Sequence, residues 1–136
     1  MPLKIEKTDV TWQQQLTEEQ YRVTRQSGTE PPFSGVYLDH DNDGAYHCIC
    51  CDQVLFASDD KFNSGCGWPS FNNQAEHGHV THCADHSLNM DRTEVRCQHC
   101  DAHLGHVFDD GPAPTGLRYC INSVALSFKD GGHDKK

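Results

Sequence analysis

The chain has 136 residues, a formal net charge of -9 and a mean hydropathy of -0.73. This length is typical of one domain with a modest core, so we expect residues 1–136 to form a single domain. The charge argues against nucleic acid and membrane as partners, because nucleic acid and anionic lipid both bind through basic surfaces. No apolar stretch is long enough for a signal peptide or a membrane span. We therefore expect a cytoplasmic protein with reduced cysteines.

Residues 1–27 predict a helical N-terminal segment. A short helical turn is expected from Val10 to Leu16. A second helix should follow, because Thr17 and Gln20 have the spacing of a capping box. Gly28 is the expected end of this second helix.

Residues 28–129 predict an antiparallel β core. No segment here keeps a helical apolar period, and short apolar runs are separated instead by Gly, Asn, Asp and Pro. The longest run, from Leu117 to Phe128, predicts one continuous strand. Residues 130–136, rich in Gly and Lys, predict a disordered tail.

Two C-x-x-C pairs, Cys48 with Cys51 and Cys97 with Cys100, have the spacing of a four-sulfur zinc site. Cys50 remains as a buried thiol, because adjacent cysteines cannot easily bind one ion together. The alternative is a pair of redox dithiols, but those usually open a helix, whereas the flanks here are strand-like. We therefore expect one structural zinc ion per chain.

Cys66 and Cys120 differ from these pairs. Cys66 lies between two glycines, which suits either a mobile thiol or an ordinary turn that holds a small apolar residue. Strand alternation puts Cys120 on one face with Arg118 and Asn122. The Arg118 cation favours a nucleophilic thiolate, and the Asn122 amide can bind a polar group.

Two histidines follow in the segment A-H-L-G-H-V-F-D-D-G-P. Regular alternation would put His103 and His106 on opposite faces of a strand. They converge only if Gly105 makes a bulge or bend. Asp109 and Asp110 could orient a nearby imidazole. Each histidine alone also fits an ordinary surface or core position.

The motifs GTEPPFSG, YHCICCDQVLF, KFNSGCGWPSF, EVRCQHCDAHLGHVFDDGP and PTGLRYCINSVALSF occur in this order between Gly28 and Phe128. In this combination the chain resembles the methionine-R-sulfoxide reductases of the B type. The resemblance implies a mainly β fold of twisted, tent-like antiparallel sheets with short N-terminal helices. It also implies a structural zinc ion on the two C-x-x-C knuckles.

The resemblance further implies a role for each motif residue. Cys120 would be the nucleophile and Cys66 the resolving cysteine, while Trp68 would bind the substrate methyl group. The polar residues around the sulfoxide would be His103, His106, Asp110, Arg118 and Asn122. Three departures from the family pattern stand out: Asn89 takes a usual glycine position, and Cys50 and Cys83 are extra thiols that could be oxidised instead of Cys66.

The expected reaction follows from sulfoxide chemistry. A thiolate attacks sulfur while an acid protonates oxygen, which leaves methionine and a cysteine sulfenic acid. A second thiol then forms a disulfide that thioredoxin would reduce, as part of oxidative-stress repair. From the resemblance we expect a monomer whose substrate is methionine R-sulfoxide, peptide-bound or free.

Two other classes of protein also fit part of the sequence. A zinc-ribbon binding module would use the four ligand cysteines but would give Cys120 and Cys66 no role. A secreted disulfide scaffold would fit the even number of cysteines. The missing signal peptide and the knuckle spacing speak against that scaffold.

Overall fold

The computed structural model describes residues 8–38, 40, 43–74, 80–85, 92–113 and 115–130. The predicted mainly β fold is confirmed within these residues. The helices are α1 (Asp9–Gln15) and α2 (Glu18–Arg25), with short 3-10 turns η1 (Ser58–Asp60) and η3 (Ser123–Ala125). The strands are β1 (Gly44–Cys48), β2 (Val54–Ala57), β3 (Lys61–Phe62), β4 (Ser70–Phe71), β5 (Val80–Asp85), β6 (Arg92–Cys97), β7 (His103–Phe108), β8 (Arg118–Ile121) and β9 (Leu126–Asp130). Asn89 and the predicted tail beyond Asp130 lie outside the described residues.

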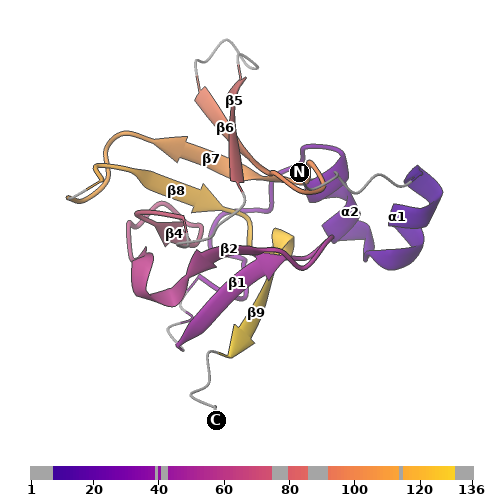
Figure 1. The fold of residues 1–136 in the computed structure, drawn as a ribbon, viewed down its shortest axis with the longest axis horizontal. Helices are drawn as coiled ribbons and strands as arrows, with labels where there is room; N and C mark the ends of the chain where they lie inside the picture. Colours follow the sequence, from indigo (N-terminus) through magenta and orange to yellow (C-terminus); the bar gives the residue numbers. More distant parts are fainter. Residues whose placement is uncertain are drawn as a thin grey trace.

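The strands form two sheets in which every described pairing is antiparallel (Figure 1). The smaller sheet has the order β2-β1-β9, and the larger has the order β3-β4-β8-β7-β6-β5. In the larger sheet β8 lies between β4 and β7, so Cys120 has a neighbouring strand on each side.

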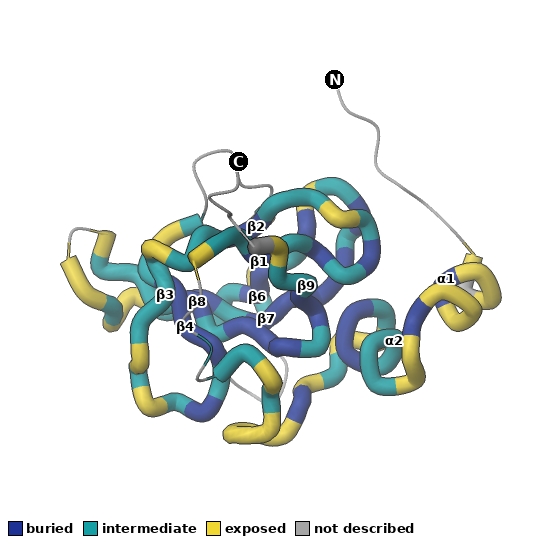
Figure 2. The backbone as a smooth tube through the Cα atoms, turned by 90° about the horizontal axis from the view of Figure 1, so that it is seen from below, coloured by how far each residue is buried: buried dark blue, intermediate teal, exposed yellow. Residues whose placement is uncertain are grey.

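Aromatic side chains join the two sheets into one core. Phe56 from β2 stacks on Phe71 from β4 with ring centroids 4.5 Å apart, and Tyr46 from β1 meets the same ring at 5.2 Å. Tyr119 from β8 completes the contact at 5.3 Å from Phe56. Figure 2 shows buried residues along the strands and exposed residues along the outer side of α1. Tyr119 thus fixes one face of β8 in the core, which leaves Cys120 on the other face.

The predicted helices form, and both dock beside the C-x-x-C turns. The capping box of Thr17 and Gln20 is present at the start of α2. This helix ends at Arg25, earlier than the expected Gly28, because Ser27 takes the left-handed backbone conformation that ends it. No helix in the described part of the chain has the length and apolar character needed to cross a bilayer.

The expected single strand from Leu117 to Phe128 is wrong. The chain leaves the larger sheet at Ile121, turns through η3 and continues as β9 in the smaller sheet. The buried Glu30 carboxylate causes this break, because it accepts the backbone N–H groups of Ser123 and Val124 at 2.9 and 3.1 Å. The same turn holds Asn122 at the end of β8.

Candidate active site and metal centre

Cys120 and Cys66 lie side by side, although they are 54 positions apart in the sequence. Their sulfur atoms are 2.9 Å apart. The Cys66 loop reaches β8 because Ile121 donates its N–H to the Pro69 carbonyl. Gly67 in this loop has a φ of 98°, and a Cβ there would come 2.7 Å from Pro32, so a larger residue would displace the loop. Of the thiols left over from the metal site, Cys66 is therefore the one that meets Cys120.

Arg118 links the Cys120 thiol to a carboxylate. Its Nη1 donates to the Cys120 sulfur at 2.9 Å, while Nε and Nη2 donate to Asp110 at 2.7 and 3.0 Å. The guanidinium also lies over the Phe108 ring at 4.5 Å from its centroid. This two-point bond holds the guanidinium plane against the thiol. Asp110 therefore acts on the site through Arg118.

The two thiols differ in acidity. Burial raises the pKa of Cys120 to about 12 and its hydrogen bond with Cys66 adds to the rise, while the Arg118 charge opposes it. Burial alone would also raise the pKa of Cys66. Hydrogen bonds with Cys120, Ser64 and Ser70 outweigh this effect and lower the pKa of Cys66 to about 7. The hydrogen bond between the two sulfurs thus shifts their pKa values in opposite directions. The Arg118 charge contacts Cys120 as expected, but it does not make Cys120 the more acidic thiol.

The two histidines converge, as a bulge at Gly105 would require. In the β6–β7 pair, Gly105 lies opposite Val95 and His103 lies opposite Arg96, so Leu104 between them has no partner residue. The ring centroids of His103 and His106 are 5.6 Å apart. His106 pairs with Cys120 across the β7–β8 ladder and lines the same pocket. His103 is buried behind it and is not among the residues that line the pocket.

Each histidine has a carboxylate partner that sequence reasoning missed. His106 Nε2 lies 2.8 Å from Asp85, and Arg92 lies 3.4 Å from the same carboxylate oxygen. His103 Nδ1 lies 2.6 Å from Glu94, and burial lowers the pKa of His103. Both carboxylates come from the β5–β6 hairpin, whose sequence lacks a motif that predicts this contact. Only the pairing of the hairpin with β7 brings them together.

The pocket above the thiols has a volume of about 150 Å³. Trp68 forms part of its wall, and its indole N–H donates to the Glu30 carbonyl at 3.0 Å. The residues that line the pocket are Thr29, Cys66, Trp68, Arg92, Gly105, His106, Phe108, Arg118, Cys120 and Asn122. Sequence reasoning gave no role to Thr29, Arg92 or Phe108. Aromatic rings, two cations and a thiol pair suit a small substrate with an apolar end and a polar group.

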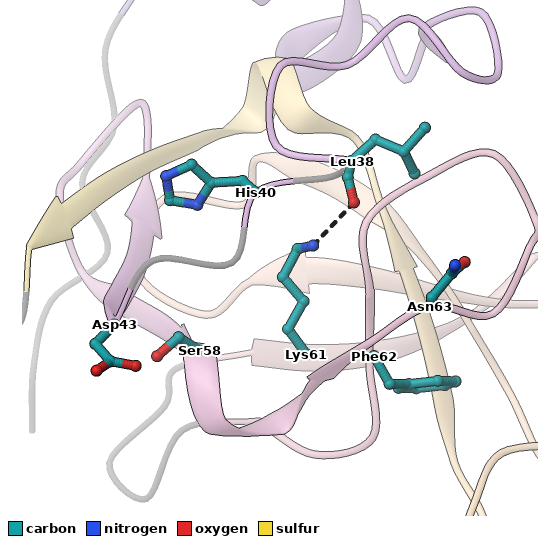
Figure 3. A pocket seen from close by; sticks show the side chains of 7 residues that line it. All are labelled: Leu38, His40, Asp43, Ser58, Lys61, Phe62 and Asn63. Carbon is teal, nitrogen blue, oxygen red and sulfur yellow. Dashed lines mark hydrogen bonds between the residues drawn. The ribbon is translucent and has the colours of Figure 1, made fainter.

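A second pocket, of about 270 Å³, lies elsewhere on the molecule (Figure 3). Its lining residues are Leu38, His40, Asp43, Ser58, Lys61, Phe62 and Asn63. Lys61 is already engaged, because its Nζ donates to the Leu38 carbonyl at 2.9 Å. His40 Nδ1 lies 2.8 Å from the Tyr46 hydroxyl. This pocket lacks a thiol, so the thiol pocket is the better candidate for chemistry.

The Glu94–His103 pair predicts a loss of stability in acid. Burial opposes ionisation of Glu94, but hydrogen bonds from Arg96 and His103 outweigh it and lower the pKa of Glu94 below its usual 4.5. Such a group contributes stability that is present above the unfolded pKa and is lost as pH falls through the folded value. We expect Glu94→Gln to lower the free energy of unfolding by about 1–3 kcal/mol at neutral pH, and by less at about pH 3.

Urea denaturation of both proteins at the two pH values measures this difference. Glu19→Gln is the control, because it removes an exposed ion pair with Arg22 and should change stability little. A Glu94→Gln effect that is equal at both pH values would contradict the assigned ionisation.

The four C-x-x-C sulfurs form a compact cluster. Cys48 lies 3.6 Å from Cys100 and Cys51 lies 3.5 Å from Cys97, and all four sulfurs lie within 4.8 Å of one another. A tetrahedral zinc ion with bonds of about 2.3 Å separates its sulfurs by about 3.8 Å. The cluster therefore fits a metal ion such as zinc. Cys50 is buried next to these ligands, as expected.

Both metal knuckles have the same backbone geometry. In each, the aspartate after the second cysteine has a positive φ, 70° at Asp52 and 65° at Asp101. Its N–H donates to the carbonyl of the first cysteine, Cys48 or Cys97. The helices fix these turns from outside, because Arg25 donates to the Cys100 carbonyl at 2.8 Å.

Comparisons with known proteins give one consistent result. The family model described as SelR domain matches residues 16–130. The chain is 55% identical to the peptide methionine sulfoxide reductase MsrB of Hahella chejuensis over 98% of this chain and 96% of that protein. It is 61% identical to MsrB of Pseudomonas syringae over 90% of this chain and 94% of that protein. It is also 56% identical to the mitochondrial methionine-R-sulfoxide reductase B2 of Danio rerio, over 87% of this chain and 69% of that protein.

Proposed function

Because the chain belongs to the B family of methionine-R-sulfoxide reductases and is a peptide-methionine (R)-S-oxide reductase, we propose that it works by thiol chemistry at Cys120 and Cys66. The observation that carries this mechanism is the contact between the two sulfurs, 2.9 Å apart at the wall of the pocket. In this proposal Cys120 is the nucleophile and Cys66 the resolving thiol.

The first step reduces the sulfoxide. Cys66, whose pKa is lowered to about 7, acts as a thiolate base that accepts the Cys120 proton as the Cys120 sulfur attacks the sulfoxide sulfur. His106 protonates the sulfoxide oxygen, and it is a better candidate than His103 because it lines the pocket. Arg118 and Asn122 hold the reacting groups. The protonated oxygen then transfers from the substrate sulfur to the Cys120 sulfur as the bond between the two sulfurs breaks, which releases methionine and leaves Cys120 as a sulfenic acid.

The second step regenerates the enzyme. The Cys66 sulfur attacks the Cys120 sulfur and forms a disulfide, and the oxygen leaves as water. An external dithiol protein such as thioredoxin then reduces this disulfide. The partly exposed Cys66 supports this assignment, because a reductant must reach one of the two sulfurs.

Trp68 is the residue that we propose selects one epimer of the sulfoxide. Its indole offers an apolar wall for the substrate methyl group, while His106 and Arg118 offer polar groups to the oxygen. Only one epimer can satisfy both sides at once. The assignment of that epimer as R comes from the family, in which a relative is named a methionine-R-sulfoxide reductase.

The proposed metal is one zinc ion held by Cys48, Cys51, Cys97 and Cys100. With four sulfur ligands such an ion supplies structural support and has no open position for substrate. We infer a reducing compartment such as the cytoplasm, because both the metal ligands and the thiol pair require reduced cysteines. From the family we further infer a monomer that acts on oxidised proteins or on free methionine sulfoxide.

A stereospecific assay tests the proposed reaction. A peptide with methionine R-sulfoxide should be reduced in the presence of thioredoxin, thioredoxin reductase and NADPH, whereas the S-sulfoxide peptide should react at least about 100-fold more slowly. Methionine is measured by chromatography, and NADPH oxidation reports thioredoxin turnover. Methionine formation with dithiothreitol but not with thioredoxin would overturn the proposed partner, and equal rates for both epimers would overturn the proposed role of Trp68.

A further inference from the structure

Asp85 on β5 binds the ring of His106 on β7, and the proposed mechanism gives this carboxylate no role. Asp85 Oδ2 lies 2.8 Å from His106 Nε2. Because β6 lies between β5 and β7 in the larger sheet, the contact reaches across one strand. Both side chains are largely buried, with 14% of His106 and 18% of Asp85 exposed. Little water can therefore compete for this hydrogen bond.

The position of Asp85 is fixed by the β5–β6 hairpin. Asp85 lies directly opposite Arg92 in this ladder, and Arg92 Nη2 donates to the same carboxylate oxygen at 3.4 Å. Glu94 lies opposite His106 in the β6–β7 ladder, but its carboxylate binds His103 Nδ1 at 2.6 Å instead. The two carboxylates thus serve different histidines, and Asp85 is the one that binds the histidine of the pocket.

The contact with Asp85 leaves one ring nitrogen of His106 for the substrate. In a protonated imidazole both nitrogens carry a hydrogen, and an ionised carboxylate can only accept. Nε2 must therefore donate to Asp85, and Nδ1 is the nitrogen that can donate to another group. His106 lies opposite Cys120 in the β7–β8 ladder and lines the thiol pocket, whereas Asp85 is not among the residues that line it. The ring thus joins the carboxylate to the pocket.

We propose that Asp85 positions His106 so that Nδ1 gives its proton to the sulfoxide oxygen. This role rests on the proposed function of His106 as the acid of the first step. The Nδ1–H bond breaks as the O–H bond forms, while Nε2 keeps its own proton in the bond with Asp85. The ring ends as the neutral tautomer that a carboxylate at Nε2 favours, and solvent returns the Nδ1 proton between turnovers. Asp85 is therefore a positioning residue that acts through His106.

The neighbouring groups fit the role of proton donor less well than His106. Arg92 also lines the pocket, but a guanidinium stays protonated in proteins. His103 is buried, and its Nδ1 is held by Glu94. Without an acceptor at Nε2, the His106 ring can rotate about its side-chain bonds and present either nitrogen. Removing the Asp85 acceptor should therefore leave fewer molecules with the productive geometry.

NMR of the protein with ¹⁵N-labelled histidine tests the assigned nitrogen without any reaction. At a pH where the histidine rings are neutral, His106 should carry its proton on Nε2, and its signals are identified by their loss in His106→Asn. In Asp85→Leu the tautomer with the proton on Nδ1 should also appear. Asp59→Asn replaces an exposed aspartate of η1 that does not line the pocket, so its spectrum should match wild type. A wild-type His106 ring protonated on Nδ1 would overturn the proposal.

Two variants of similar size separate the hydrogen bond from packing. Asp85→Asn keeps an oxygen toward His106, because an amide NH₂ at that position would meet the Arg92 donor, whereas Asp85→Leu has no acceptor. In single turnovers with R-sulfoxide peptide, the maximal rate of methionine formation should fall about 100-fold in Asp85→Leu. Asp85→Asn should be at least about tenfold faster than Asp85→Leu. The half-saturating peptide concentration should stay near the wild-type value in both variants.

A step that does not use His106 guards against a folding defect. Thioredoxin should reduce a preformed Cys66–Cys120 disulfide at the wild-type rate in both Asp85 variants. Slower reduction in Asp85→Leu would overturn the positioning role, because Asp85 would then support the site as a whole. Equal rates of methionine formation in Asp85→Asn and Asp85→Leu would also overturn it. If His106→Asn forms methionine at the wild-type rate, the proposed function of His106 as the acid fails instead.

Discussion

Replacing Cys120 with serine is expected to reduce methionine formation by at least about 10⁴-fold, because a serine hydroxyl is a far weaker nucleophile than a thiolate. The substitution keeps a small polar side chain next to Arg118 and Cys66, so the fold should persist. Single-turnover assays with R-sulfoxide peptide measure the loss, and circular dichroism checks the fold. Methionine formation by Cys120→Ser at a rate near wild type would end the assignment of the nucleophile.

Cys66→Ser should show a different pattern. The first step remains possible, so about one methionine per chain should form in the absence of reductant. Turnover with thioredoxin should be lost, because no disulfide can form next to Cys120. Dimedone should label Cys120 in this variant.

The extra thiols provide the matched controls. Cys83 lies on β5, three strands from Cys120 in the same sheet, and Cys50 lies beside the metal ligands. Cys83→Ser should therefore keep thioredoxin-dependent turnover. Full turnover by Cys66→Ser would move the resolving role to Cys50 or Cys83, and loss of that turnover in a Cys66 and Cys83 double variant would identify Cys83.

Local signals in the sequence predicted several elements correctly. The capping box at Thr17 involves residues three positions apart, and the C-x-x-C spacing fixes each knuckle within a single turn. Gly105 likewise marked the bulge that brings His103 and His106 together. In each case the responsible atoms lie close along the chain, so the pattern of residue types carries the information.

Long-range contacts explain what the sequence could not predict. The strand after Cys120 breaks at Ile121 because Glu30, 93 residues before Ser123, binds the backbone of the following turn. A carboxylate at such a distance leaves no periodic signal. The contact of Asp85 with His106 and the position of Ser70 opposite Cys120 likewise depend on which strands become neighbours. Strand order must be known before such partners can be assigned.

The direction of the thiol pKa shifts also could not be predicted from the sequence. Arg118 two residues from Cys120 predicted a stabilised thiolate, and the guanidinium does contact the sulfur. Burial and the hydrogen bond with Cys66 raise the pKa of Cys120, and together they outweigh the lowering effect of the Arg118 charge. Both effects arise from tertiary packing, so only the folded structure gives their sign.

Loss of the proposed zinc ion is expected to unfold much of the chain. Cys48 ends β1 of the smaller sheet and Cys97 ends β6 of the larger, so an ion bound to both would tie the two sheets together. Structural zinc contributes roughly 10–16 kcal/mol in small domains, which is comparable to the whole stability of about 5–15 kcal/mol of a typical protein. We therefore expect Cys97→Ser, or prolonged chelation of wild type, to abolish cooperative thermal unfolding.

The effect should reach the helices and the active site together. Gln15 on α1 and Arg25 on α2 donate to carbonyls of the knuckle residues Cys50 and Cys100, so both helices lose their anchor when the knuckles open. The second knuckle also leads into β7, which carries His106. Far-ultraviolet circular dichroism, metal content by atomic absorption and activity should thus fall in parallel.

Cys83→Ser is the matched control for the metal prediction, because it removes a thiol from β5 and leaves the four ligands intact. It should retain about one zinc per chain and a cooperative melt near the wild-type temperature. A Cys97→Ser protein with that same melt would mean that the two sheets hold together without the metal. In that case the aromatic contacts of Tyr46, Phe56 and Phe71 across the sheets would suffice, and the knuckles would serve only to anchor the helices.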